Sequence, residues 1–412
     1  MNLEAVEICA GAGGQALGLE KAGFEHALAV ELDPNACNTL RHNRSKWKVS
    51  EGDVADREVW DPADYRDIAL LAGGVPCPPF TIAGKQLGAT DERDLFAWAI
   101  ELVAIVRPQA LLLENVRGLS MPRFTGYRQH VLDRLIDLGY VAEWRLLQAS
   151  DFGVPQLRPR FVLVALRPEH AEYFSWPEPL GTPPTVGATL RDLIGSDGWE
   201  HAEAWAQKAN KIAPTIVGGS KKHGGADLGP TRAKRAWAEM GVDALGVADT
   251  PPKRGDTFPV GPKLTADMVA RIQGWSDAYP WEFTGRKTTK YRQIGNAFPP
   301  PVAHAVGSAI YSALEHKGER IERVLPEHDP IYKVLRDNAD FMTPAQISRA
   351  VGQALEAADL EHRISLLSRD FDVEMQTTAT ATAYKLGRFK AFVGQEDHAR
   401  NELFLKHRAR IS

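Results

Sequence analysis

The chain has 412 residues, 44% of them hydrophobic, and a formal net charge of −4, so it is long enough for two or three soluble domains. Its three cysteines, Cys9, Cys37 and Cys77, are too scattered for a disulfide framework, and none belongs to a C-x-x-C pair, so we expect no metal. No apolar run is long enough to cross a membrane and no signal segment begins the chain, which favours the reducing cytoplasm.

The chain begins with a predicted strand at residues 6–10, a glycine turn at residues 11–14 and a helix. This order lets a ligand approach the backbone at a helix N-terminus, although a plain tight turn explains the glycines equally well. A second strand ends at Glu31, about twenty residues past the turn, where a carboxylate can accept hydrogen bonds from the ribose of a nucleoside cofactor. A third strand ends at Gly52-Asp53-Val54 and adds a second carboxylate to the same edge.

An apolar run, residues 68–72, predicts a buried strand that leads into Gly73-Gly74-Val75-Pro76-Cys77-Pro78-Pro79. The prolines fix backbone angles on both sides of Cys77, so little orientational entropy is left to lose when a thiolate attacks. The alternative is a small buried hydrophobe in a proline-rich turn, which is how most lone cysteines behave.

Strands and amphipathic helices continue to alternate as far as residue 165. One strand at residues 110–113 ends in Glu114-Asn115-Val116, and another at residues 161–165 follows Gln156-Leu157-Arg158-Pro159-Arg160. This alternation predicts a mostly parallel, doubly wound α/β sheet with helices on both faces. Ligands bind such sheets at the carboxyl ends of the strands, which is where the cysteine and the three carboxylates fall.

Prolines, glycines and basic residues multiply between residues 176 and 283, and regular periodicity fades. A glycine-rich loop holds Lys221 and Lys222, and a second cluster holds Arg232, Lys234 and Arg235. Such charges suit a surface that grips phosphates, although a solvated face is the common alternative. Order returns at residues 286–296, and a helix with apolar spacing follows from Val302 to Leu314.

A separate unit begins near Asp329. Helix signals at residues 329–338, 343–355 and 360–367 are followed by two short strand patterns, which is the order of a winged helix-turn-helix. The basic side chains that would meet phosphates are Arg363, Arg369, Lys385, Arg388 and Lys390. A structural or protein-binding accessory fits this part of the sequence nearly as well.

The blocks between residues 4 and 315 resemble, in composition and order, the DNA (cytosine-5)-methyltransferases of bacterial restriction–modification systems. The matching blocks are the glycine turn, Glu31, Gly52-Asp53, the Pro-Cys loop, Glu114-Asn115-Val116, the Gln-x-Arg-x-Arg run at residues 156–160, and Gly295-Asn296. One such block is weak support, but the whole ordered set is specific.

The resemblance implies S-adenosyl-L-methionine as methyl donor. It makes Cys77 the nucleophile on carbon 6 of cytosine, Glu114 the partner of ring nitrogen 3 and the exocyclic amine, and Arg160 the residue that binds the base oxygen and orients Glu114. The resemblance also places Arg158 among the catalytic residues, as a support for the loop or for a phosphate. The cofactor residues that it implies are Cys9, Gly11, Gly13, Gly14, Glu31, Leu32, Asp53, Val54, Pro76 and Asn296.

The resemblance also implies double-stranded DNA as the partner, with the target cytosine flipped out of the helix. The expected DNA-binding residues are Lys85, Gln86, Lys221, Lys222, Arg232, Lys234 and Arg235. The expected fold is a Rossmann-like, doubly wound catalytic domain at residues 1–180, a target-recognition region at 181–283, a return of the catalytic core at 284–325 and a winged-helix-like unit at 326–412. We expect a monomer that associates with the nucleoid through DNA.

The chain departs from the family pattern at three positions. Cys9 and Gln15 stand where phenylalanine is usual or frequent, and Pro78 replaces a common glutamine after the nucleophile. Two other functions remain open: a tRNA cytosine-5 methyltransferase and a non-catalytic DNA-binding regulator. The tRNA-modifying branch usually carries Cys-Phe-Thr in its recognition region, and the similar triplet here is Glu282-Phe283-Thr284.

Overall fold

The computed structural model describes residues 3–75, 95–218, 226–322, 329–377 and 382–389. Within these residues a central sheet has the strand order β3-β2-β1-β4-β5-β7-β6. Its strands are β1 (Glu4–Ile8), β2 (Glu25–Glu31), β3 (Val49–Glu51), β4 (Leu70–Gly73), β5 (Ala110–Val116), β6 (Val141–Gln148) and β7 (Pro159–Leu166). Strands β1 to β5 pair in parallel, whereas β7 runs antiparallel to both β5 and β6.

The prediction of a mostly parallel sheet is confirmed, with one strand added. Strand β6 was not predicted from the sequence, because Glu143 and Arg145 interrupt its apolar pattern. The burial of β6 nevertheless alternates through Ala142 and Trp144, so its core face packs while its polar residues point outward. The strand predicted from Phe161 begins earlier, at Pro159.

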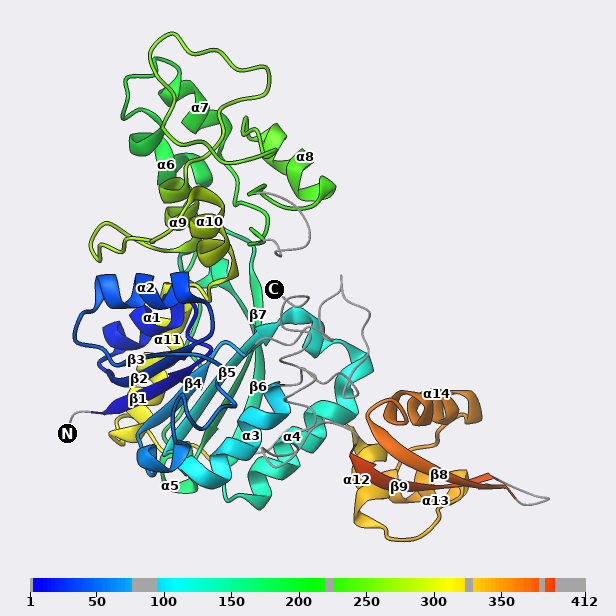
Figure 1. Cartoon of the computed structure of the whole chain (residues 1–412). Helices are drawn as coiled ribbons and strands as arrows, with labels where there is room; N and C mark the ends of the chain where they lie inside the picture. Colours follow the sequence, from blue (N-terminus) through cyan, green and yellow to red (C-terminus); the bar gives the residue numbers. More distant parts are fainter. Residues whose placement is uncertain (1–2, 76–94, 219–225, 323–328, 378–381, 390–412) are drawn as a thin grey trace.

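Helices cover both faces of the sheet (Figure 1). On one face α3 (Leu95–Val106) and α4 (Thr125–Asp137) pack on alternate side chains of the strands. On the other face lie α1 (Gly14–Ala22) and α11 (Pro300–Leu314). The shorter elements of this core are α2 (Pro34–Asn43), α5 (Pro168–Ala171), and the 3-10 turns η1 (Pro62–Tyr65), η4 (Arg117–Ser120), η5 (Pro122–Phe124) and η6 (Ala149–Phe152).

The chain returns to this core after a long excursion, because α11 packs directly against α1. Gly18 makes the approach possible: a Cβ there would overlap the side chain of Ala303 and lie 2.6 Å from the carbonyl oxygen of Pro300. Residues near position 300 therefore belong to the same apolar core as the first strand.

The excursion forms a lobe beyond the sheet edge (Figure 1). Its helices are α6 (Val186–Ile194), α7 (Ala202–Lys208), α8 (Thr231–Glu239) and α9 (Ala266–Gln273), followed by α10 (Lys287–Asn296) at the junction with the core. Long loops connect them around a separate apolar cluster that includes Trp205, Trp237 and Met268. These loops explain why prolines and glycines are frequent and periodicity is weak in this part of the sequence. The short helices between the loops were not predicted.

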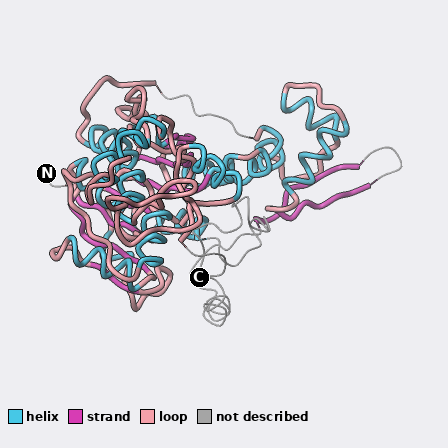
Figure 2. The backbone as a smooth tube through the Cα atoms, turned by 90° about the horizontal axis from the view of Figure 1, so that it is seen from above, coloured by secondary structure: helices cyan, strands magenta, loops and turns pink. Residues whose placement is uncertain are grey.

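The C-terminal elements are α12 (Pro330–Asp337), α13 (Pro344–Val351), α14 (Ala357–Leu367), β8 (Phe371–Thr377) and β9 (Thr382–Phe389). The two strands form an antiparallel hairpin, which projects away from the rest of the chain (Figure 2). Asp329 and Thr343 cap α12 and α13, and proline follows each of them at the first helical position.

No described helix combines the length and apolar character that a membrane span requires. Likewise, the described side chains of His, Cys, Asp and Glu form no group of three suited to holding a metal ion.

Candidate active site

A cavity of about 310 Å³ lies at the carboxyl ends of the strands, between the sheet edge and α10. Most of the expected cofactor residues line it: Cys9, Gly11, Gly14, Glu31, Leu32, Asp53, Val54 and Asn296. Gly13 belongs to the same turn but does not line the cavity, and Pro76 lies outside the described residues. Residues from the N-terminal part of the chain and residues from α10 and the turn after it therefore line the same cavity.

The glycine turn passes through left-handed backbone angles. Gly11 has φ of 56° and Gly13, the N-cap of α1, has φ of 91°. These angles suit glycine because it has no Cβ to clash with the neighbouring carbonyl. Cys9 also has a positive φ, of 51°. Burial, and then the nearby Glu31 carboxylate, raise the pKa of the Cys9 thiol well above its ordinary value, which keeps it protonated and unreactive.

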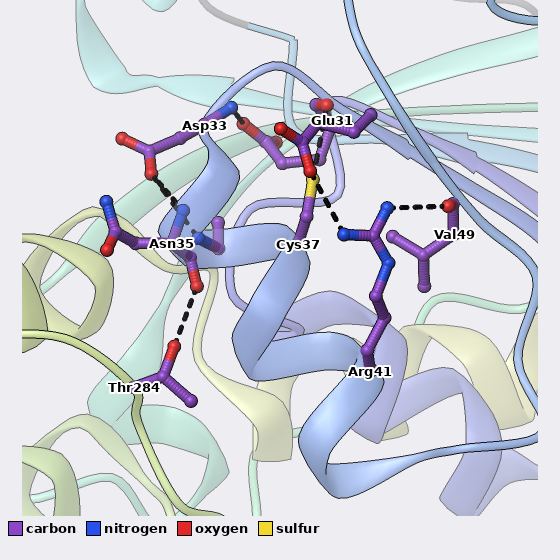
Figure 3. Close-up of polar contacts among 9 residues, drawn as sticks. Glu31, Asp33, Asn35, Cys37, Arg41, Val49 and Thr284 are labelled. Atoms are coloured by element: carbon purple, nitrogen blue, oxygen red, sulfur yellow. Dashed lines mark hydrogen bonds and ion pairs between the residues drawn. The ribbon is translucent and has the colours of Figure 1, made fainter.

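The Glu31 carboxylate is fixed by two backbone amides, and Figure 3 shows the one from Asp33. The amide of Gly11 donates to one oxygen at 2.7 Å, and the amide of Asp33 donates to the other at 2.8 Å. Each oxygen retains a lone pair for a ligand hydroxyl. Burial raises the pKa of Glu31, and these backbone hydrogen bonds partly offset that rise.

The two further groups at this end of the cavity are Leu32 and Asp53. Leu32 is 37% exposed, so it presents an apolar side chain to whatever occupies the cavity. The Asp53 side chain accepts a hydrogen bond from the amide of Ala55 at 3.0 Å. One apolar and one acidic group thus flank Glu31.

Glu114 lines the opposite end of the cavity and pairs with Arg160. The two residues come from neighbouring antiparallel strands, and their side chains are about one-tenth exposed. A Cβ on Gly74, at the end of β4, would lie 3.4 Å from the carboxylate of Glu114. Cys77 follows Gly74 by three positions in the sequence and lies outside the described residues.

Arg158 lies away from the cavity and is fully buried. Its guanidinium donates to the carbonyl oxygens of Ile216 at 2.6 Å, Gly295 at 2.7 Å and Ala297 at 3.0 Å. Burial lowers its pKa well below the ordinary value of arginine. These bonds join the backbone at Ile216, in the lobe, to the end of α10. Arg158 therefore links the sheet to the lobe.

The expected DNA-binding residues fall into two groups. Arg232 and Arg235 are exposed on α8, and Lys234 beside them is half-buried and pairs with Asp227 at 2.8 Å. Lys85, Gln86, Lys221 and Lys222 lie outside the described residues. Of the expected DNA-binding surface, the described residues therefore include two exposed arginines on one helix.

Several cavity residues were not predicted from sequence as binding residues: Ala10, Ala12, Gln15, Thr289, Arg292, Gln293 and Phe298. The last four come from α10 and the turn after it, which only tertiary packing brings to the glycine turn. Gln293, for example, accepts from Thr39 at 2.6 Å and donates to the carbonyl of Thr284 at 2.9 Å. No local sequence pattern reports a contact of this range.

The family model for C-5 cytosine-specific DNA methylases matches residues 3–312. The chain belongs to this family. The methylase is 68% identical over 412 residues to the Type II methyltransferase M.NaeI of Lentzea aerocolonigenes, with both chains covered fully. It is 51% identical over 319 residues to M.NgoMIV of Neisseria gonorrhoeae, which covers 76% of this chain and 99% of the relative.

Two solved structures share the fold of the methylase. One is described as a DNA modification methyltransferase encoded within an Escherichia coli prophage, with a TM-score of 0.53, 22% identity, and coverage of 76% of this chain and 100% of the other. The other is DNMT2 of Spodoptera frugiperda, with a TM-score of 0.53, 17% identity, and coverage of 75% and 99%.

The methylase uses S-adenosyl-L-methionine, and the cavity suits this group. A buried carboxylate with free lone pairs matches the ribose hydroxyls, and the side-chain-free glycine turn admits a ligand close to the backbone. Glu114 lines the same cavity.

Proposed function

We propose that this methylase modifies carbon 5 of cytosine within one specific sequence of double-stranded DNA, as the protective enzyme of a restriction–modification system. The observation that carries the proposal is the Glu114–Arg160 pair at the wall of the cavity that also holds Glu31. The Type II designation of relatives such as M.NaeI supports the biological role.

We assign Cys77 as the nucleophile. Its thiolate adds to carbon 6 of the flipped cytosine, which makes carbon 5 electron-rich enough to take a methyl group. S-adenosyl-L-methionine supplies that methyl group from its sulfonium. Loss of the proton from carbon 5 then restores the double bond and expels the thiolate from carbon 6.

Glu114 and Arg160 stabilise the charge that develops on the base. Glu114 would face ring nitrogen 3 and the exocyclic amine, where a proton held at nitrogen 3 would offset the negative charge that the thiolate brings to the ring as it adds. Arg160 holds the Glu114 carboxylate in place through their ion pair and would bind the base oxygen. Arg158 acts as a positioning residue through its carbonyl contacts.

We infer that residues 181–283 read the DNA sequence, while residues 1–180 and 284–325 form the catalytic core. Support comes from the apolar cluster that draws most of its members from the lobe, among them Trp205 and Trp237, and from the exposed arginines of α8. Residues 326–412 form a winged-helix-like accessory. The described part of that accessory carries nine acidic against seven basic residues, a balance that favours a structural role over phosphate binding.

Bisulfite sequencing of plasmid DNA from cells that express the methylase tests this proposal. Protected cytosines should gather at one position of one short motif, and Cys77→Ala should leave that motif unprotected. Purified enzyme should also transfer methyl groups to duplex DNA in preference to tRNA transcripts. Methylation of tRNA alone would establish the RNA-modifying alternative. If no methyl group is transferred to either DNA or tRNA, the result would favour a non-catalytic DNA-binding regulator.

A further inference from the structure

Gln15 is a buried amide at the wall of the cavity. It is the second residue of α1, it is 3% exposed, and it lines the cavity beside Gly14. Among the described residues, neither its amide nitrogen nor its amide oxygen has a hydrogen-bond partner. Burying an amide without partners costs about 1–3 kcal/mol, so native proteins seldom retain one without a reason.

Neighbouring polar groups of the cavity differ from Gln15 in this respect. Glu31 accepts from two backbone amides, Asp53 accepts from Ala55, and Gln293 bonds to Thr39 and Thr284. Those side chains are held by the protein itself. The resemblance also leads us to expect an aromatic residue at position 15, which would fill the space without a polar group.

We propose that Gln15 binds the amino-acid end of S-adenosyl-L-methionine. An amide offers donors on nitrogen and an acceptor on oxygen, and the α-amino-acid group presents a carboxylate and an ammonium that match them. This inference rests on the proposed placement of the cofactor in the cavity. Glu31 serves the ribose, and α1 follows β1, which lies between β2 of Glu31 and the strands that lead to Glu114.

The test compares two ligands by calorimetry. S-adenosylhomocysteine has the amino-acid end, whereas 5′-methylthioadenosine lacks it. Gln15→Leu should lower the affinity for S-adenosylhomocysteine about tenfold, because hydrogen bonds to charged groups are removed. The affinity for 5′-methylthioadenosine should stay unchanged. The melting temperature of the ligand-free protein should hold or rise, because the substitution removes a buried amide that lacks partners.

Glu31→Ala is the matched control, since it should lower the affinity for both ligands. Unchanged affinity of this control for both ligands would reject the placement of the cofactor itself. If the control responds, equal effects of Gln15→Leu on the two ligands, or no effect on either, would overturn the role of Gln15. A lower melting temperature of ligand-free Gln15→Leu would also overturn it, because the amide would then have a partner within the protein.

Discussion

At the scale of single residues, the two carboxylates of the cavity are held by different means. Glu31 is fixed by backbone amides, which carry no charge, and burial therefore still raises its pKa. Glu114 is held instead by the side chain of Arg160, in a site where both side chains are about one-tenth exposed. The first arrangement suits neutral hydroxyl donors, and the second fixes the carboxylate that we propose faces the base.

Glu31→Ala should weaken cofactor binding by roughly 1.5–3 kcal/mol, the cost of removing hydrogen bonds to a charged group. Because the pKa of Glu31 is raised above 4.5, the ionised form that binds hydroxyls best is lost as pH falls through that raised value. Calorimetry from pH 8 down to pH 5 should show affinity falling in the wild type. Glu31→Gln should bind weakly with a flatter pH profile, and a profile parallel to the wild type would contradict the assignment.

The sequence predicted Glu31, Asp53 and Glu114 because each stands at or near the carboxyl end of a strand, and parallel strands bring these ends to one edge. It did not predict the contribution of Gln293, which reaches Thr39 across a sequence separation of 254 residues. The catalytic assignment of Arg158 came from its motif alone. Its three carbonyl partners depend on how two lobes close on each other, which no local pattern encodes.

At the scale of elements, α4 joins the catalytic core to the C-terminal unit. Arg123, just before α4, forms two hydrogen bonds to the buried Asp370, at 3.0 and 3.3 Å. Gly126 leaves room for Leu367, whose side chain occupies the space that a Cβ at position 126 would need. The helices of this unit were predicted from sequence, but this docking was not, because its two faces are more than two hundred residues apart in the chain.

His130 makes this interface sensitive to pH. Its ring packs against Phe389 and Phe371 at centroid distances of 4.1 and 5.4 Å, and Nδ1 lies 3.1 Å from the hydroxyl of Tyr332. Burial lowers the pKa of His130 to about 4. The unfolded chain binds the proton with a pKa of about 6.5, so stability is present at neutral pH and is lost as pH falls from 6.5 toward 4.

Between pH 7 and pH 5 the free energy of unfolding should therefore fall by about 2 kcal/mol more in the wild type than in His130→Phe. Urea unfolding at the two pH values measures this difference. The phenylalanine variant removes the titrating group while it keeps a ring in the aromatic cluster. Equal pH dependence in both proteins would show that His130 is not buried neutral at the interface.

At the scale of the whole molecule, the net charge of −4 does not show how the basic and acidic residues are distributed. Exposed arginines stand on α8 of the lobe, whereas the described C-terminal unit is slightly acidic. We therefore propose that the main electrostatic contact with DNA lies on the lobe, where Lys221 and Lys222 precede α8 in the sequence. Which of the basic residues of α8 are exposed was not readable from composition, because exposure depends on the fold.

Replacing Arg232 and Arg235 with alanine should weaken DNA binding and flatten its salt dependence, by about 0.9 in logarithmic slope for each phosphate that is no longer neutralised. Arg66→Ala with Arg107→Ala is the matched control, since these exposed residues precede β4 and β5 at the opposite edge of the sheet. Fluorescence anisotropy across a salt series gives both slopes. If the two double variants behave alike, α8 is an ordinary solvated face.

The most direct test of the catalytic assignment is covalent trapping on a duplex with 5-fluorocytosine at the methylated position. Fluorine cannot leave carbon 5 as the proton does, so the wild type with cofactor should form an adduct that survives denaturing gel electrophoresis. Cys77→Ala should form none, and Glu114→Gln should form it roughly a hundredfold more slowly. An adduct with Cys77→Ala, or full-speed trapping by Glu114→Gln, would contradict the proposed active site.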